Sequence, residues 1–226
     1  MSGRLAGKRV LVTQADRFMG PITAAVFGEE GAEVVADSRD LTVAGAAAAA
    51  VAAAGRVDVL VANLAGPNFS GIATADLGDD DWQAAFAAMV HPLHALVRAV
   101  LPQMIERRAG KVVVYGSASA LRGMKTLAAY SAARAAQLGY VQSVGVEVAP
   151  HNVQVNLIAQ NYVENEDYYP AALRAKDSFQ QSLRRQVPAG RLAKPREDAM
   201  FAVFLASDEC GFICGQGIPF AGGWAQ

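Results

Sequence analysis

The chain has 226 residues, of which 53% are hydrophobic, and its formal net charge at pH 7 is −1. This length and apolar content argue against a disordered chain and suit one domain that spans residues 1–226. A net charge so close to zero gives no support to nucleic acid or an anionic membrane surface as a partner.

Segments typical of strands and helices alternate along the chain. Apolar runs rich in β-branched residues predict buried strands at residues 8–13, 33–37, 57–63, 111–117, 153–160 and 217–220. Helical spacing of apolar residues predicts helices at 20–31, 43–54, 79–107 and 127–148, the third kinked or broken at Pro92 and Pro102. This alternation predicts a Rossmann-like, doubly wound parallel sheet with helices on both faces. Ligands of such sheets bind beyond the carboxyl ends of the strands.

The turn after the first predicted strand, VTQADRFMG at residues 12–20, lies where a nucleotide-binding enzyme has a glycine-rich turn. Glycines allow the backbone of such a turn to approach a pyrophosphate closely. Here only Gly20 remains, and Gln14 and Phe18 place side chains where the turn normally has none. A phenylalanine at the phosphate position argues against a bound dinucleotide.

The interval between the second and third predicted strands is short. Only 26 positions separate Asp37 from Asn63, whereas a βαβ unit alone takes roughly 30 residues. We therefore expect one strand–helix unit of a full dinucleotide fold to be missing, together with one wall of an adenine pocket. An acidic residue at the position of Asp37 binds ribose hydroxyls in such folds. Without the rest of that site, we interpret Asp37 as a vestige or as a cap for the next segment.

Three residues form a candidate catalytic group. Ser117 ends the fourth predicted strand, Tyr130 follows thirteen positions later, and Arg134 four positions after that. Tyr130 and Arg134 share one face of a predicted helix, and a guanidinium held beside a phenol stabilises the phenolate. A serine hydroxyl can bind the same substrate oxygen, so the group could act as a general base for an alcohol proton. On spacing alone, two surface residues of a helix are the simpler interpretation.

The pattern S-x12-Y-x3-R resembles the Ser-Tyr-Lys triad of the short-chain dehydrogenases, with Arg134 in place of the lysine. The stretches VDVLVANLAG, RRQVPAGRLAKPREDA and FLASDECGFICGQGIPFAGGW resemble other parts of that family. Taken with T-x4-F-x-G in the first turn, the pattern resembles the halohydrin dehalogenases over the full chain, most of all the B-type members.

This resemblance implies a cofactor-independent enzyme that converts vicinal haloalcohols to epoxides and releases halide and a proton. It also implies epoxide opening by cyanide, azide or nitrite, with Ser117, Tyr130 and Arg134 as the catalytic residues. The residues that it implies for a halide or nucleophile pocket are Phe18, Gln160, Asn161, Tyr162, Val163 and Tyr169. Tyr168 is left unassigned, and residues 67–74 are expected to shape the substrate pocket. A homotetramer is the assembly that the resemblance implies.

Two other functions stay open. One is an NAD(P)-dependent short-chain oxidoreductase with a divergent cofactor turn, and the other is an inactive relative that serves as a binding or regulatory subunit. Retention of Ser117, Tyr130 and Arg134 together argues against the inactive relative. Some dehalogenases have proline at the position of Gln160, which could reshape the halide site. The asparagine of the dehydrogenase proton relay is replaced near Met89 or Val90.

The cysteines and histidines do not predict a metal site. Cys210 and Cys214 alone cannot complete a tetrahedral site, and we expect two free thiols in the core or at an interface. His91 and His94 have a spacing compatible with a metal but lack a third ligand, so we expect packing or interface contacts. The sequence has no signal-peptide pattern, and its longest alanine-rich run is shorter than the roughly 20 residues of a membrane span. We therefore expect a cytoplasmic protein.

Overall fold

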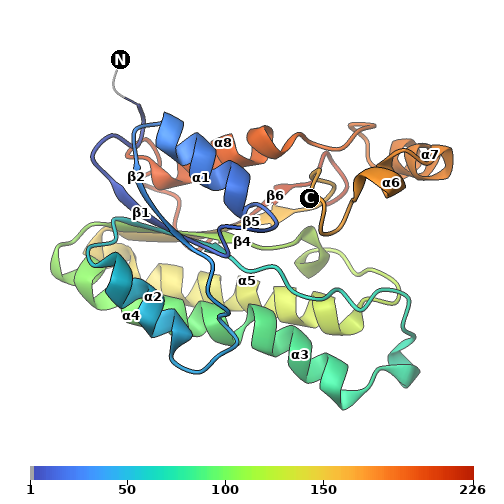
Figure 1. The fold of residues 1–226 in the computed structure, drawn as a ribbon, viewed down its shortest axis with the longest axis horizontal. Helices are drawn as coiled ribbons and strands as arrows, with labels where there is room; N and C mark the ends of the chain where they lie inside the picture. The colour runs from blue at the N-terminus through green and yellow to red at the C-terminus, as the bar shows by residue number, and fades with distance from the viewer. Residues whose placement is uncertain (1–2) are drawn as a thin grey trace.

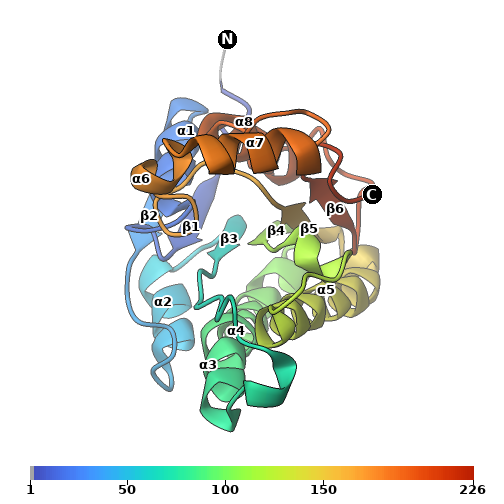
Figure 2. The ribbon, with the colours of Figure 1, turned by 90° about the vertical axis from the view of Figure 1, so that its right-hand side faces the viewer.

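The β-branched runs form one sheet in the computed structural model, which describes residues 3–226. Its strands are β1 (Arg9–Thr13), β2 (Glu33–Asp37), β3 (Val59–Asn63), β4 (Gly110–Tyr115), β5 (Val153–Gln160) and β6 (Gly217–Phe220). All are parallel, in the order β2-β1-β3-β4-β5-β6. Helices cover both faces of the sheet (Figure 1 and Figure 2). The predicted Rossmann-like, doubly wound fold is confirmed.

Alternate residues of the strands enter two different cores. Val10 and Val12 of β1 pack into the cluster on one face, whereas Leu11 packs into the cluster on the other. All three are fully buried. A strand that is covered on both faces has no polar side, which explains why these strands are continuous apolar runs in the sequence.

The interval between the second and third strands is shortened, as expected. Only α2 (Ala46–Ala54) joins β2 to β3, and β2 is the edge strand of the sheet. The usual dinucleotide fold has the strand order 3-2-1-4-5-6. The strand that would lie outside β2 is absent from residues 3–226. The strand order reverses between β1 and β3, and the turn from β1 to α1 (Gly20–Glu29) lies at this switch point.

The helices form two layers. On one face lie α1 and α8 (Pro195–Ala206), with α6 (Ala171–Arg174) and α7 (Asp177–Gln186) beyond the carboxyl ends of the strands (Figure 1). The other face carries α2, α3 (Asp79–Met89), α4 (His91–Glu106) and α5 (Ala128–Val148). Short 3-10 turns occur at Thr74–Asp76, Ala118–Ala120 and Ala149–His151.

The long helix predicted at residues 79–107 is two helices. The break lies at Val90, and Pro92 stands in the first turn of α4, where a missing N–H costs nothing. Of the kink or break expected at Pro102, the break is wrong, because α4 continues through Pro102 to Glu106. Val100 and Met104, on either side of Pro102, are fully buried, and their packing outweighs a proline penalty of about 3 kcal/mol.

The span Asp79–Glu106 is long and apolar enough to cross a membrane, judged by length and composition alone. Only 39% of its most apolar window is buried in the described chain. Core helices of soluble proteins pass the same test, so this is weak evidence for a membrane span.

Two glycines of α5 test how closely this helix must approach the sheet. A Cβ at Gly145 would overlap the backbone of Gly215, whereas a Cβ at Gly139 would meet open space. We expect Gly145→Ala to lower the free energy of unfolding by about 1–3 kcal/mol through overpacking. The matched change Gly139→Ala should raise it by up to about 1 kcal/mol through helix propensity. Urea denaturation checks both, and equal effects would contradict the close contact.

Candidate active site

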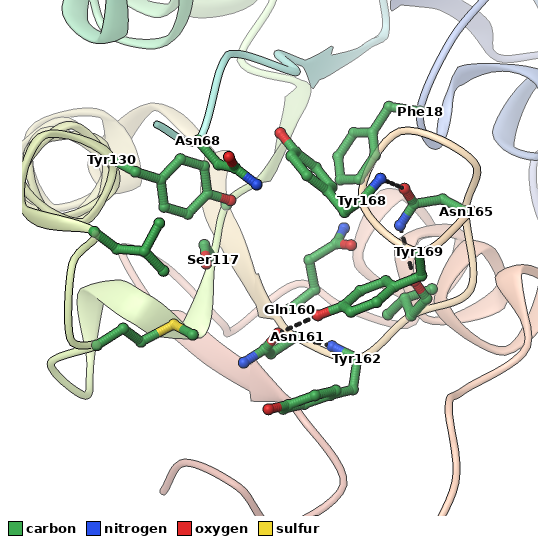
Figure 3. Close-up of a pocket in the computed structure, with 14 residues that line it drawn as sticks. Phe18, Asn68, Ser117, Tyr130, Gln160, Asn161, Tyr162, Asn165, Tyr168 and Tyr169 are labelled. Carbon is green, nitrogen blue, oxygen red and sulfur yellow. Dashed lines mark hydrogen bonds between the residues drawn. The ribbon is translucent and has the colours of Figure 1, made fainter. Parts of the chain in front are cut away.

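A cavity of about 140 Å³ opens at the carboxyl ends of β4 and β5 (Figure 3). It is lined by Phe18, Asn68, Gly116, Ser117, Met124, Leu127, Tyr130, Gln160, Asn161, Tyr162, Val163, Asn165, Tyr168 and Tyr169. Of the predicted site residues, only Arg134 does not line it. A cavity of about 150 Å³ accepts a molecule the size of benzene, so this one suits a small substrate.

Ser117 and Tyr130 present their hydroxyls at this cavity. Ser117 follows β4, and its Oγ accepts the backbone N–H of Ser119 at 3.2 Å, which leaves its own proton available for donation. Tyr130 lies in the first turn of α5. Its hydroxyl is near the guanidinium of Arg134 and makes no hydrogen bond to any other of residues 3–226. Both oxygens are thus available to a ligand.

Arg134, one turn after Tyr130, is completely buried. Its Nη1 donates to the carbonyl of Tyr115 at 3.1 Å and to Oε1 of Gln137 at 2.9 Å. The Gln137 amide in turn donates to the carbonyl of Met89 at 2.7 Å, next to the position where we expected the relay asparagine to be replaced. These contacts fix the guanidinium 5.1 Å from the centroid of the Tyr130 ring.

The charge of Arg134 is not neutralised by a carboxylate of the described chain. No ion pair involves it, and its Nε and Nη2 lack hydrogen-bond partners there. Burial alone would lower the pKa of Arg134, but the phenols of Tyr130 and Tyr168 outweigh burial and raise it. The guanidinium therefore remains a cation whose nearest ionisable neighbours are phenols.

The turn between β1 and α1 keeps a backbone shape that favours glycine. Gln14 has φ 43° and Phe18 has φ 51°, and a non-glycine residue in this left-handed region costs about 1–3 kcal/mol. Hydrogen bonds from Asn63 Nδ2 to the carbonyls of Gln14 (2.9 Å) and Arg17 (3.0 Å) stabilise the turn. The side chain of Gln14 also accepts the N–H of Ala65 at 2.7 Å. Side chains thus fill the turn, while its backbone keeps the positive φ angles that favour glycine.

Tyr168, which the sequence left unassigned, forms the wall between this turn and Tyr130. Its ring meets the edge of the Phe18 ring at 5.2 Å and lies 6.3 Å from that of Tyr130. Its hydroxyl donates to the carbonyl of Gly66 at 3.0 Å. Burial raises the pKa of Tyr168 to about 12, so this hydroxyl stays protonated at neutral pH. Beyond Tyr168 lies a second hollow of about 530 Å³, lined in part by Arg17 and Asp40.

The floor of the cavity offers amide donors. Asn161 Oδ1 accepts from the N–H of Tyr162 and from the hydroxyl of Tyr169, both at 2.9 Å, which orients the amide. The Nδ2 of Asn161 and the Nε2 of Gln160 are buried and have no partner among the described residues. Figure 3 shows the Gln160 amide reaching toward the space between Ser117 and Tyr168. Buried, unpaired N–H groups favour a bound acceptor such as an anion.

The remaining pocket residues enclose this floor. The rings of Tyr162 and Tyr169 stack at 5.9 Å, and the Tyr162 hydroxyl donates to Gln186 at 2.9 Å. Val163 is buried and bridges to Ala193. Of residues 67–74, Asn68 alone is among the lining residues of the cavity in the described chain.

The other sequence expectations concern residues outside the cavity. Asp37 binds the backbone and the guanidinium of Arg39, as expected of a cap. Cys210 and Cys214 are free thiols. His94 packs against Tyr140, with ring centroids 5.8 Å apart. In residues 3–226 there is no cluster of three or more side chains suited to a metal ion.

Comparisons with known proteins agree on one family, but the matched proteins differ in their named activities. The family model described as enoyl-(acyl carrier protein) reductase matches residues 6–225. The 3-oxoacyl-(acyl-carrier-protein) reductase FabG of Vibrio harveyi is 31% identical over 251 residues, covering 97% of this chain and 98% of its own. The 2-keto-3-deoxy-L-fuconate dehydrogenase of Xanthomonas campestris pv. campestris is 30% identical over 247 residues, covering 99% and 82% respectively.

Solved structures extend the likeness. One described as a dehalogenation enzyme superposes with a TM-score of 0.91 at 33% identity, covering 97% of this chain and 99% of its own. A gluconate 5-dehydrogenase from Burkholderia cenocepacia, in complex with NADP and tartrate, superposes with a TM-score of 0.88 at 28% identity, covering 98% and 96%.

Proposed function

The chain belongs to the short-chain dehydrogenase/reductase superfamily, and we propose that within it this protein is a halohydrin dehalogenase. Its reaction would convert a vicinal haloalcohol to an epoxide without a cofactor, and the reverse would open an epoxide with a small anion. The observation that carries the proposal is the free Tyr130 hydroxyl beside the buried Arg134, across a small cavity from unpaired amide donors.

The chemistry needs one base and one anion site. Tyr130, as phenolate, removes the proton of the substrate hydroxyl while Ser117 donates a hydrogen bond to the same oxygen. The alkoxide attacks the neighbouring carbon, so a carbon–oxygen bond forms as the carbon–halogen bond breaks, and the halide leaves with the electron pair. The proton passes from Tyr130 to solvent. Arg134 acts through Tyr130 by stabilising the phenolate.

The leaving halide needs donors on the side opposite the alkoxide. We place it among the pocket residues that the sequence analysis named, Phe18, Gln160, Asn161, Tyr162, Val163 and Tyr169. Amide N–H groups and the positive edges of aromatic rings suit a large, weakly hydrated anion. The orientation of the Asn161 amide and the unpaired donor of Gln160 support this assignment.

Two features disfavour hydride transfer. Side chains fill the phosphate turn, and the wall made by Phe18 and Tyr168 separates the cavity from the larger hollow near β1 and β2. A dinucleotide has to reach across that wall, since its nicotinamide reacts beside the tyrosine and its phosphates bind at the turn. The small cavity is complete without it.

The second candidate function is an NAD(P)-dependent oxidoreductase, favoured by the names of the reductase relatives and by the NADP-bound neighbour. It predicts enhanced fluorescence of NADPH or NADH on mixing with the protein. Binding of either cofactor at micromolar concentration would favour this candidate and contradict our proposal.

The proposed base can be tested with one substitution. We expect the wild type to release chloride and acid from 1,3-dichloro-2-propanol, and Tyr130→Phe to lower kcat about 10²- to 10⁴-fold, the usual contribution of a general base. Tyr140→Phe is the matched control, because Tyr140 lies on the same helix and its hydroxyl contacts His94 far from the cavity. No chloride release by the wild type, or full activity of Tyr130→Phe, would reject the mechanism.

We also propose a homotetramer built through α4 and α5. The apolar span that ends with α4 is largely uncovered, and Val146 of α5 is 73% exposed. Light scattering should give four times the chain mass of 23.6 kDa for the wild type and a smaller assembly for Val146→Arg. Ala25→Arg is the control, since Ala25 is exposed on α1, on the other face of the sheet. A wild type with the mass of one chain would refute the assembly.

A further inference from the structure

The carboxylate of Asp167 lies at the turn between β1 and α1, although Asp167 comes from the segment after β5. One of its oxygens accepts the backbone N–H of Phe18 at 2.7 Å. The other pairs with the guanidinium of Arg17 at 2.9 Å. In dinucleotide folds, the N–H groups of this turn and of the following helix bind a pyrophosphate. In this chain an internal anion satisfies the Phe18 N–H and the nearby cation.

The same carboxylate connects the two residues whose rings form the cavity wall. It holds the backbone of Phe18, and the next residue in the chain is Tyr168, whose ring contacts the Phe18 ring. The Tyr168 N–H donates to Asn165 Oδ1 at 2.8 Å, and the Asn165 amide donates to the carbonyl of Val163 at 2.8 Å. These two hydrogen bonds hold residues 163–168 in one conformation, and Asp167 is the residue through which this segment binds the turn.

The hydrogen bond to Phe18 is more important than the ion pair to Arg17. A carboxylate that accepts a backbone N–H makes a short, charge-assisted bond with a defined direction. It supports Phe18 in its left-handed conformation, at φ 51°. The Arg17 side chain is 52% exposed, and ion pairs at such positions contribute little. Removal of the acceptor should thus disturb the wall more than removal of the charge on Arg17.

We propose that Asp167 is an internal substitute for the phosphate of a cofactor and a positioning residue for the anion pocket. By occupying the turn, it presents the Phe18 ring to the cavity and holds the Tyr168 ring against it. This occupancy of the phosphate position by the Asp167 carboxylate is inferred from the contacts alone. The effect of Asp167 on the anion pocket rests on the proposed function.

The occupancy is tested by the binding of inorganic phosphate, measured by calorimetry. In Asp167→Ala the Phe18 N–H loses its internal acceptor and becomes available to phosphate. One charge-assisted hydrogen bond corresponds to about tenfold in affinity, so Asp167→Ala should bind phosphate about tenfold more tightly than the wild type. Asp16→Ala is the matched control, because Asp16 is an exposed carboxylate of the same turn without a hydrogen bond to any of residues 3–226. No gain for Asp167→Ala, or an equal gain for Asp16→Ala, would overturn the occupancy.

Asp167→Asn covers the case in which Asp167→Ala fails to fold. It keeps the shape and one acceptor for the Phe18 N–H but removes the charge, so it should gain phosphate affinity by a smaller factor. Absence of any gain in a folded Asp167→Asn would likewise overturn the occupancy.

The positioning effect is tested by the kinetics of epoxide opening with azide. We expect Asp167→Ala to raise the KM for azide about tenfold, with the KM for the epoxide changed less than about twofold, and Arg17→Ala to have a smaller effect on azide. An unchanged KM for azide, or equal rises for azide and epoxide, would overturn the positioning effect. If the wild type opens no epoxide, the proposed function fails, and the phosphate titration alone decides the occupancy.

Discussion

A buried positive charge without a carboxylate partner is the constraint on which this site depends. A charge removed from water is costly unless other groups stabilise it, and removal of one partner from a buried pair is strongly destabilising. Arg134 has one nitrogen that donates to a backbone carbonyl and to Gln137, and its guanidinium carbon lies 5.1 Å from the centroid of the Tyr130 ring. A carboxylate at this position would neutralise the guanidinium. Within residues 3–226 no carboxylate pairs with Arg134, and the phenols of Tyr130 and Tyr168 are the groups that raise its pKa despite burial.

The turn after β1 has a backbone shape that favours glycine, although side chains fill it. Gln14 and Phe18 hold positive φ angles that glycine adopts without strain, and polar contacts from Asn63 and Asp167 compensate. The helix that follows starts at Gly20, where a side chain would clash with the carbonyl of Gln14. The frame of a nucleotide turn is thus intact, while side chains now occupy the space above it.

Sequence reasoning reached the sheet and much of the site for a simple reason. Buried parallel strands are continuous apolar runs, and their carboxyl ends meet at one edge, so Ser117 and Gln160 could be placed near each other without coordinates. It named Tyr169 for the pocket and left Tyr168 unassigned, because an irregular loop has no period that gives side-chain direction. Nor could it find the partner of Asp167, which lies about 150 positions away in the chain. Contacts of this kind leave no local pattern.

The shortened sheet has a consequence for the protein in concentrated solution. With no strand outside it, β2 exposes the N–H and C=O groups of one edge, and exposed edges invite pairing between molecules and aggregation. This edge is only five residues long, it begins at Glu33 and ends at Asp37, and Glu33 forms an ion pair with Arg9. Short length and charges at both ends are the usual protections of an edge strand. The shortened sheet thus ends in a margin whose length and charges resist fibril-like association.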